Sequence, residues 1–245
     1  MRQRLDQALV DRALAPTRSQ ARDLVKRGCV RVAGVPAAKA GLLVGGEDRV
    51  EVTPGAQPFV SRGGLKLAAA LETFAFSPAG RICLDIGAST GGFTQVLLGG
   101  GAKRVHAVDV GHGQLSPLLA GDPRIISLEG FDARCLTRGE LPDPVGAIVA
   151  DTSFISLTRI LEPALQFAAD GAWLVALIKP QFELGRGDIG SGGIVRSEAA
   201  HQRAIDKVRG WLTAQPGWTV CGVIASPITG GGGNREFLIG VQRDR

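Results

Sequence analysis

The sequence predicts an α/β fold: a mostly parallel sheet with one antiparallel edge strand, preceded by a small α+β module. From residue 82 onward, short apolar runs typical of strands alternate with runs of helical periodicity, which is the pattern of a parallel sheet covered by helices. The last two strand-like runs, residues 220–225 and 236–241, flank a glycine-rich segment at residues 229–234. That arrangement is typical of a hairpin and therefore indicates an antiparallel strand.

Length and composition fit one medium-sized domain and a small one, which we expect at residues 59–245 and 1–58. No uncharged apolar run approaches the ~20 residues of a membrane span, and the charged N-terminus lacks the apolar segment of a signal peptide. The cysteines are far apart: Cys29, Cys83, Cys135 and Cys221. This spacing argues against a zinc site and a disulfide framework and favours a cytoplasmic setting. We therefore expect neither a membrane nor a metal partner.

The N-terminal module is expected to contain two short helices and a small sheet. Apolar residues recur at helical spacing from Leu5 to Ala13, and Pro16 should end that helix. Thr17, with a glutamine three residues later, predicts the start of a second helix that runs to Arg27 and stops at the following glycine. Strands are expected at residues 29–32 and 49–52, and residues 53–58 have the composition of a linker.

Positive charge is concentrated in this module. Residues 1–60 contain ten Lys and Arg against six Asp and Glu, whereas the rest of the chain is nearly balanced at eighteen against seventeen. Five cations lie on or just after the second expected helix: Arg18, Arg22, Lys26, Arg27 and Arg31. A small basic module of this kind predicts binding to RNA backbone. The alternative is a solvated basic helical hairpin without a ligand.

The stretch from Leu84 to Asp109 predicts a cofactor site. An apolar strand (82–86) enters a glycine-rich turn that opens a helix (92–98), and a second strand (104–109) ends at an acid. Gly87 and Gly91 let the backbone come close to a ligand, and Asp109 is placed to bind ribose hydroxyls.

The amino-acid sequence of the turn indicates which cofactor it suits. The turn lacks the second glycine of the dinucleotide pattern G-x-G-x-x-G, which places a pyrophosphate on a helix N-terminus. Asp85, just before the turn, suits a cofactor with a cationic amino-acid end. S-adenosylmethionine has such an end and no phosphate, so it is the predicted cofactor. The alternative is a plain β-α turn capped by serine or threonine.

The remaining elements continue the alternation. A helix is expected at residues 65–74, ahead of the first strand of the large domain. Further strands are expected at residues 124–128, 147–151, 173–179, 220–225 and 236–241, and further helices at 114–119, 156–168 and 197–215. Three polar residues follow or end successive strands: Asp132, Asp151 and Lys179. Because ligands bind at the carboxyl edge of such sheets, we expect these side chains at the site. The glycine-rich segment 181–195 is either a lid that orders on substrate or a flexible connection.

Two resemblances make the expectation specific. Residues 3–60, through Ser19-Gln20-Ala21-Arg22-Asp23-Leu24 and Gly28-Cys29-Val30-Arg31-Val32, resemble the RNA-binding module of the ribosomal-protein-S-four type. Nearly the whole chain resembles the TlyA family of ribosomal RNA cytidine 2′-O-methyltransferases, which are related to the FtsJ-type ribose methyltransferases and are often labelled hemolysins. Five segments carry this resemblance: residues 61–67, 84–87, 151–154, 178–183 and 233–237.

The resemblance implies a Rossmann-like methyltransferase domain with assigned site residues. It places a catalytic tetrad at Lys66, Asp151, Lys179 and Glu236. It places the cofactor-binding residues at Asp85, Gly87, Ser89, Gly91, Asp109 and, near the adenine, Asp132. The implied substrate is ribosomal RNA within a ribosomal subunit, a cytidine of 23S RNA with 16S RNA as a second candidate, and the oligomeric state stays open.

The expected chemistry is methyl transfer to a ribose 2′-hydroxyl, which needs in-line positioning and removal of the hydroxyl proton. We expect Lys179 to be the base or the group that orients the hydroxyl. A neighbouring Lys66 would lower the pKa of the lysine pair and the two carboxylates would raise it, so the net direction is open. The alternative for the tetrad is an ordinary buried ion-pair network.

Three other functions are weighed against this one. A nucleotide-binding oxidoreductase is disfavoured by the missing G-x-G-x-x-G and by the absence of tyrosine. A non-catalytic RNA-binding ribosome-assembly factor would keep the module but not the chemistry. A membrane-lytic protein is supported only by the hemolysin label, because no cationic amphipathic segment rich in aromatic residues is present.

Overall fold

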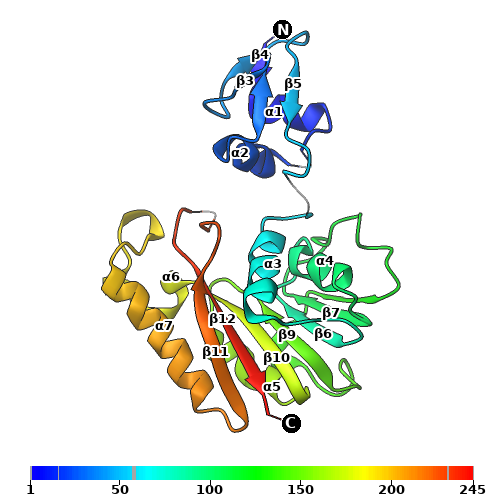
Figure 1. Ribbon diagram of the computed structural model, residues 1–245, viewed down its shortest axis with the longest axis vertical. Coiled ribbons are helices and arrows are strands. Elements are labelled where there is room, and N and C mark those ends of the chain that lie inside the picture. The colour runs from blue at the N-terminus through cyan, green and yellow to red at the C-terminus, as the bar shows by residue number, and fades with distance from the viewer. Residues whose placement is uncertain (1, 16, 57–58, 231, 245) are drawn as a thin grey trace. The chain divides into compact units, whose positions relative to one another are not determined.

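The computed structural model describes residues 2–15, 17–56, 59–230 and 232–244, and the chain divides into two compact units, residues 1–62 and 63–245 (Figure 1). Each unit has an apolar core of its own. The division falls just after Arg62. The boundary that we predict after Pro58 lies outside the described residues and stays a prediction.

Unit 1 packs two short helices against small sheets. The helices are α1 (Leu5–Asp11) and α2 (Arg18–Lys26). The strands are β1 (Gln3–Arg4), β2 (Val30–Val32), β3 (Val35–Pro36), β4 (Leu43–Val44) and β5 (Val50–Val52). They form an antiparallel β1-β4 pair and a three-stranded sheet of order β3-β2-β5. The two-residue strands β1, β3 and β4 were not expected, because such short segments carry no periodicity in the sequence.

The helix ends in unit 1 differ partly from expectation. Helix α1 stops at Asp11, before Ala13, whose φ of 56° is left-handed. The next residue, Arg12, donates to the carbonyl oxygens of Asp48 (2.6 Å) and Gly45 (2.7 Å), which holds the chain away from a helical path. Pro16, the expected stop, lies outside the described residues. Helix α2 begins as expected, because the Thr17 hydroxyl accepts a hydrogen bond from the backbone N–H of Gln20.

Unit 2 contains a seven-stranded sheet of order β11-β12-β10-β9-β6-β7-β8. The strands are β6 (Ile82–Ile86), β7 (Arg104–Asp109), β8 (Ile125–Glu129), β9 (Val145–Ala150), β10 (Ala168–Ile178), β11 (Trp218–Ala225) and β12 (Phe237–Arg243). Neighbours from β10 to β8 pair in parallel. The antiparallel strand β12 lies between β10 and the edge strand β11, so this edge of the sheet is antiparallel as the sequence predicts.

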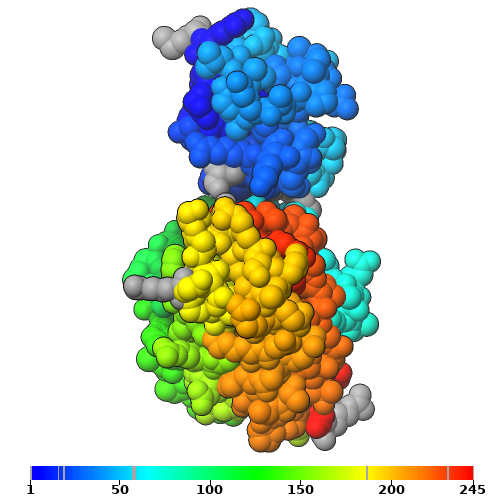
Figure 2. Space-filling model, turned by 90° about the vertical axis from the view of Figure 1, so that its left-hand side faces the viewer, coloured from blue at the N-terminus to red at the C-terminus, as the bar shows by residue number. Residues whose placement is uncertain are grey.

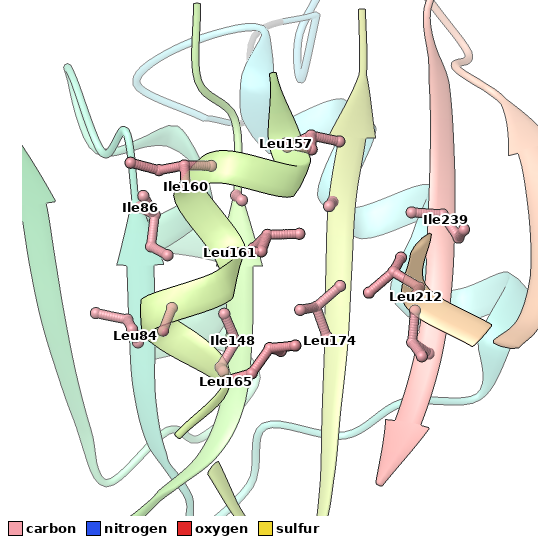
Figure 3. Close-up of a cluster of buried hydrophobic side chains, with 14 of the residues drawn as sticks. Leu84, Ile86, Ile148, Leu157, Ile160, Leu161, Leu165, Leu174, Leu212 and Ile239 are labelled. Carbon is pink, nitrogen blue, oxygen red and sulfur yellow. The ribbon is translucent and has the colours of Figure 1, made fainter. Parts of the chain in front are cut away.

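Helices cover both faces of this sheet (Figure 1). Helices α3 (Gly63–Phe74) and α4 (Gly92–Gly99) pack together on one face, and α5 (Leu157–Leu165) and α7 (Glu198–Thr213) pack together on the other. Figure 3 shows Leu161 and Leu165 of α5 facing Ile148 and Leu174 of the sheet. These side chains are almost fully buried. The free energy gained by burying them holds α5 on the sheet and thereby stabilises the strands whose ends carry the site.

The expected helix at residues 114–119 is wrong: the chain forms turns there. The Glu129 carboxylate accepts the backbone N–H groups of Gly113 (2.8 Å), Gln114 (2.7 Å) and Leu115 (3.0 Å). The Ser116 N–H bonds to the carbonyl oxygen of Thr90 (3.2 Å) and Pro117 has no N–H, so these residues do not supply the donors of a regular helix. The expected helix at 156–168 is also too long, since it ends at Leu165 and β10 already begins at Ala168.

The glycine-rich segment after Lys179 contains short helical turns: α6 (Pro180–Glu183) and 3₁₀ turns at Arg186–Asp188 and Ser191–Gly193. It lies against the start of α7, as Figure 2 shows in yellow and orange. The His201 ring nitrogen Nε2 is 3.0 Å from the Val195 carbonyl oxygen, and Asp188 pairs with Arg203. These contacts anchor the middle and the C-terminal end of the segment, and its role as a lid stays a prediction.

Candidate active site

The turn after β6 has the backbone conformation that its glycines allow. Gly87 and Gly91 have φ values of 81° and 90°, and Ser89 also has a positive φ, 47°. A Cβ on Gly87 would lie 2.5 Å from the carbonyl oxygen of Asp151, so only glycine fits between the turn and β9. Asp109 accepts the backbone N–H groups of Ser89 and Gly111, both at 2.8 Å, and so ties the turn to the end of β7.

A pocket of about 630 Å³ opens at this edge of the sheet. Four of the six predicted cofactor residues line it: Gly87, Ser89, Asp109 and Asp132. Asp132 is held by Arg134, which lowers its pKa. The structure places Gly91 away from the lining, because it packs against the side chains of Leu115 and Leu119.

Asp85 lies behind the turn rather than in the pocket, since it is completely buried. One carboxylate oxygen accepts the Thr94 hydroxyl at 2.6 Å, and the other has no hydrogen-bond partner among the described residues. Burial raises the pKa of Asp85 to about 7, and the charges of Asp151 and Asp109 add to the increase. A buried carboxylate with one unused oxygen fits a cationic group on the other side of the turn.

S-adenosylmethionine fits these residues. Asp109 ends β7, and Asp132 follows β8, the next strand in the sheet. Their carboxylates can accept hydrogen bonds from the hydroxyl groups of a ribose and the amino group of an adenine. Asp85 lies behind the turn with one carboxylate oxygen unpartnered among the described residues, and its role toward the amino-acid end of the cofactor stays a prediction. Ser89 stands where the second glycine of the dinucleotide pattern would be, so the turn departs from the pattern that places a pyrophosphate on a helix N-terminus.

The four tetrad residues meet at the same edge of the sheet in two ion pairs. Lys66 donates to Glu236 at 2.6 Å, and Lys179 lies 2.7 Å from Asp151. Ile178 of β10 pairs with Phe237 of β12 in antiparallel register. Lys179 and Glu236 are the next residues on the two chains, so they are neighbours at this edge of the sheet. The Lys66–Glu236 pair is nearly sealed, with side chains 7% and 4% exposed, whereas those of Lys179 and Asp151 are 12% and 20% exposed. Lys179 and Asp151 are therefore the more accessible of the two pairs.

Ser153 and Phe154, which follow Asp151, also lie at the site, although the sequence pattern assigned them no role. The Lys179 ammonium donates to the Ser153 hydroxyl at 2.9 Å. Phe154 is 91% exposed and has a φ of 65°, which is a strained conformation for a bulky residue. Both residues line the cofactor pocket. They belong to a segment that carries the family resemblance, but their roles depend on contacts with Lys179 and with solvent that sequence spacing does not show.

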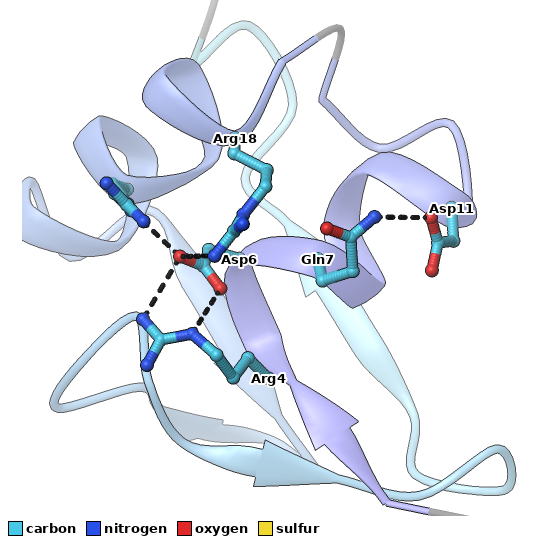
Figure 4. Close-up of polar contacts among 6 residues, drawn as sticks. Arg4, Asp6, Gln7, Asp11 and Arg18 are labelled. Atoms are coloured by element: carbon cyan, nitrogen blue, oxygen red, sulfur yellow. Dashed lines mark hydrogen bonds and ion pairs between the residues drawn. The ribbon is translucent and has the colours of Figure 1, made fainter.

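In unit 1, two of the predicted RNA-binding residues share one buried carboxylate. Asp6 is completely buried and accepts hydrogen bonds from Arg4 (3.0 Å) and Arg18 (3.3 Å), which Figure 4 labels, and from Arg22 (2.8 Å). The side chains of these three arginines are about half exposed, at 50%, 46% and 55%. The guanidinium groups hold the pKa of Asp6 well below its usual range. Three cations on one anion leave a net positive cluster with fixed geometry.

The other predicted RNA-binding residues differ in accessibility. Arg27 pairs with Asp23 at 2.8 Å and is 26% exposed, and Arg62 pairs with the same aspartate at 3.1 Å. Lys26 and Arg31 are exposed. The structure thus keeps Lys26, Arg31 and the cluster around Asp6 accessible, whereas Arg27 is largely engaged by its own helix.

Two further findings concern metal ions and membranes. Within the described parts of the chain, no group of three or more His, Cys, Asp or Glu side chains is arranged to hold a metal ion. In the same parts of the chain, no helix combines the length and apolar character needed to cross a membrane.

A parallel sheet with an acid-lined pocket at its carboxyl edge defines the class: this chain is an S-adenosylmethionine-dependent methyltransferase. A model of the FtsJ-like methyltransferase family matches residues 59–243, and a model of the S4 domain matches residues 3–50. The chain belongs to the TlyA family of FtsJ-like methyltransferases.

The similarity to known proteins extends over nearly the whole length of this chain. The chain is 45% identical to the 16S/23S rRNA (cytidine-2′-O)-methyltransferase TlyA of Mycobacterium tuberculosis, over 97% of this chain and 89% of that one. Hemolysin A of Brachyspira hyodysenteriae is 39% identical, over 96% of this chain and 98% of that one. A solved structure of a hemolysin-named protein from Streptococcus thermophilus has a TM-score of 0.77 and 39% identity, over 99% and 89% of the two chains.

Proposed function

We propose that the protein methylates a ribose 2′-hydroxyl of ribosomal RNA, on a cytidine of 23S RNA and also of 16S RNA, within a ribosomal subunit in the cytoplasm. The observation that carries the proposal is the pair of lysine–carboxylate contacts at the edge of the cofactor pocket. Relatives named for cytidine 2′-O-methylation of ribosomal RNA support the substrate class.

The tetrad has the groups that this reaction needs. The cofactor supplies an electrophilic methyl group when bound. Lys179, held by Asp151 and Ser153, orients the 2′-hydroxyl, and its neutral amine form takes up the hydroxyl proton and becomes the ammonium that Asp151 pairs with. The buried Lys66–Glu236 pair holds the start of β12 beside Lys179 and keeps the local charge balanced.

Two exposed features suit an RNA substrate: an aromatic ring in unit 2 and a basic cluster in unit 1. Phe154 presents an exposed aromatic face beside Asp151, and unstacked RNA bases bind to such faces. The Arg4, Arg18 and Arg22 cluster in unit 1 offers guanidinium groups to phosphates, with Asp6 holding them in place. Lys26 and Arg31 add exposed charge to the same module.

The decisive experiment is methyl transfer from labelled cofactor to purified ribosomal subunits, followed by mapping of the modified nucleotide. We expect Lys179→Ala to lower the single-turnover rate by ~10²–10⁴-fold, because a positioned acid–base group typically contributes that much. The affinities for cofactor and subunits should change little. Lys103→Ala, at a residue outside the site, serves as the control.

Two outcomes would contradict the proposal. A Lys179→Ala enzyme at nearly wild-type rate would place the base elsewhere. Wild-type protein that binds subunits and cofactor without transferring methyl would instead indicate a non-catalytic assembly factor.

A further inference from the structure

A second pocket, of about 950 Å³, lies beside the cofactor pocket. Its walls are the two segments that leave the Asp151–Lys179 pair: residues 154–159, which follow β9, and residues 181–185, which follow β10. Lys207 of α7 contributes to the far wall. Phe154 and Arg159 line both pockets, so the two pockets adjoin. We name this second pocket the side pocket.

The inner wall of the side pocket is fixed by a buried acid. Glu183, with a side chain only 1% exposed, accepts the Ser156 hydroxyl (2.6 Å) and the Leu157 backbone N–H (2.7 Å). It also pairs with Lys207 at 3.2 Å. Because these three donors occupy the carboxylate, Glu183 holds the two walls together and is not itself free for a ligand. The pocket is therefore preformed rather than assembled by binding.

Two polar groups in this pocket lack protein partners. The exposed Arg159 guanidinium forms no ion pair or side-chain hydrogen bond within the described residues. The Gln181 carboxamide oxygen is buried, and within the same residues it has no hydrogen-bond partner. A free guanidinium fork matches a phosphate. A buried carbonyl oxygen without a partner calls for a donor, such as a ribose hydroxyl or a base amino group.

Aromatic surface connects this pocket to the reacting end. The ring of Phe182 lies 5.1 Å from that of Phe154, and the Lys179 ammonium is 6.0 Å from the Phe182 ring centroid. A strand of RNA whose 2′-hydroxyl reaches Lys179 must continue out of the cofactor pocket. The side pocket begins at that point and combines a cation, a hydrogen-bond acceptor and aromatic surface, which are the elements that bind single-stranded RNA.

We propose that the side pocket binds the unpaired nucleotide next to the methylated one, with its phosphate on Arg159 and its sugar or base hydrogen-bonded to Gln181. This inference rests on the function proposed above. Arg159 acts here as a substrate-binding residue that sets the register of the RNA strand against Lys179. An unstacked neighbour is required, since a duplex does not present an isolated nucleotide to a pocket of this size.

The test compares full-length wild-type, Arg159→Ala and Gln181→Ala proteins in binding to purified ribosomal subunits over a series of salt concentrations. Calorimetric titration with S-adenosylmethionine reports the integrity of the cofactor site in the same proteins. Arg209→Ala, at a cation of α7 that lines a different pocket, is the matched control.

For Arg159→Ala we expect subunit affinity to fall about tenfold, the size of one lost charged hydrogen bond. The slope of log affinity against log salt should become shallower by about 0.7, the value for one single-strand phosphate. Gln181→Ala should weaken binding without changing the slope, and Arg209→Ala should match wild type. Cofactor affinity should stay at the wild-type value in all variants.

Two results would overturn the inference. Unchanged subunit affinity and salt slope in Arg159→Ala would show that the side pocket binds no RNA phosphate. Reduced cofactor affinity in that variant would assign Arg159 to the cofactor's own carboxylate instead. Wild-type protein that bound subunits without methylating them would count against the proposed function, while the binding comparison would still decide the inference.

Discussion

At the scale of single residues, the buried ionisable groups differ in whether a group of opposite charge lies beside them. Lys66 and Glu236 are both nearly sealed from water, but each compensates the other. Asp85 is equally buried; one of its oxygens accepts the Thr94 hydroxyl, and the other has no hydrogen-bond partner within the described residues. Its pKa of about 7 is the physical result. A residue held in this way is poised to ionise when a cation arrives.

This pKa gives a pH dependence with a definite sign. Because the folded-state pKa of Asp85 is raised above its unfolded value, its contribution to stability is fully present below about pH 4. That contribution is lost as the pH rises through about 7. We expect Asp85→Asn, which keeps an acceptor for Thr94, to remove this loss. Urea unfolding without cofactor, at pH 5 and pH 8, measures it, with Asp170→Asn as an exposed control.

The same group predicts proton release on cofactor binding. At pH 6 most Asp85 side chains are protonated, so a cationic cofactor end should displace close to one proton per molecule bound. Calorimetry in buffers of different ionisation enthalpy counts that proton. Binding that releases no proton at pH 6, or an Asp85→Asn variant that releases as many as wild type, would remove Asp85 from the cofactor site.

At the scale of elements, the sequence predicted what local pattern determines. Strands β6 and β7 have the predicted bounds, because apolar runs end there at a glycine turn and an acid. The helix expected at residues 114–119 failed because the acid that captures its N–H groups, Glu129, lies on the next strand. The contact between Lys66 and Glu236, 170 residues apart, likewise depends on β12 entering the sheet antiparallel beside β10.

The junction of β6 and β9 carries a prediction of its own. At Gly87 an added Cβ meets the Asp151 carbonyl oxygen at 2.5 Å, whereas at Gly80, with a similar φ of 71°, nothing lies within 4 Å. We expect Gly80→Ala to lower the free energy of unfolding by about 1–2 kcal/mol, the cost of a left-handed alanine. Gly87→Ala should cost roughly 1–3 kcal/mol more, through overpacking.

Because the displaced atom belongs to Asp151, methyl transfer should also fall in Gly87→Ala and not in Gly80→Ala. Denaturant unfolding and single-turnover rates separate the two effects. Equal stability and equal rates in the two variants would show that the turn and Asp151 are not coupled.

At the scale of the whole molecule, charge and chemistry belong to different units. The net positive charge lies largely in residues 1–60, and the pockets and the tetrad lie in unit 2. Composition alone predicted this division, since a count of cations needs no knowledge of the fold. It did not predict that Asp6 would gather three arginines, because that depends on how α1 and α2 pack. RNA anchoring and cofactor binding should therefore be separable by truncation.

We expect a protein that lacks residues 1–58 to keep a folded unit 2, since that unit is compact and has its own apolar core. Its cofactor affinity should equal that of the full chain. Methylation of ribosomal subunits should fall steeply, and the salt dependence of RNA binding should become shallower, because the phosphate contacts of the basic module are gone. Calorimetry, methyl transfer and binding at several salt concentrations measure these three quantities. A truncated protein that modified subunits at the full-length rate would show that the module does not anchor the RNA.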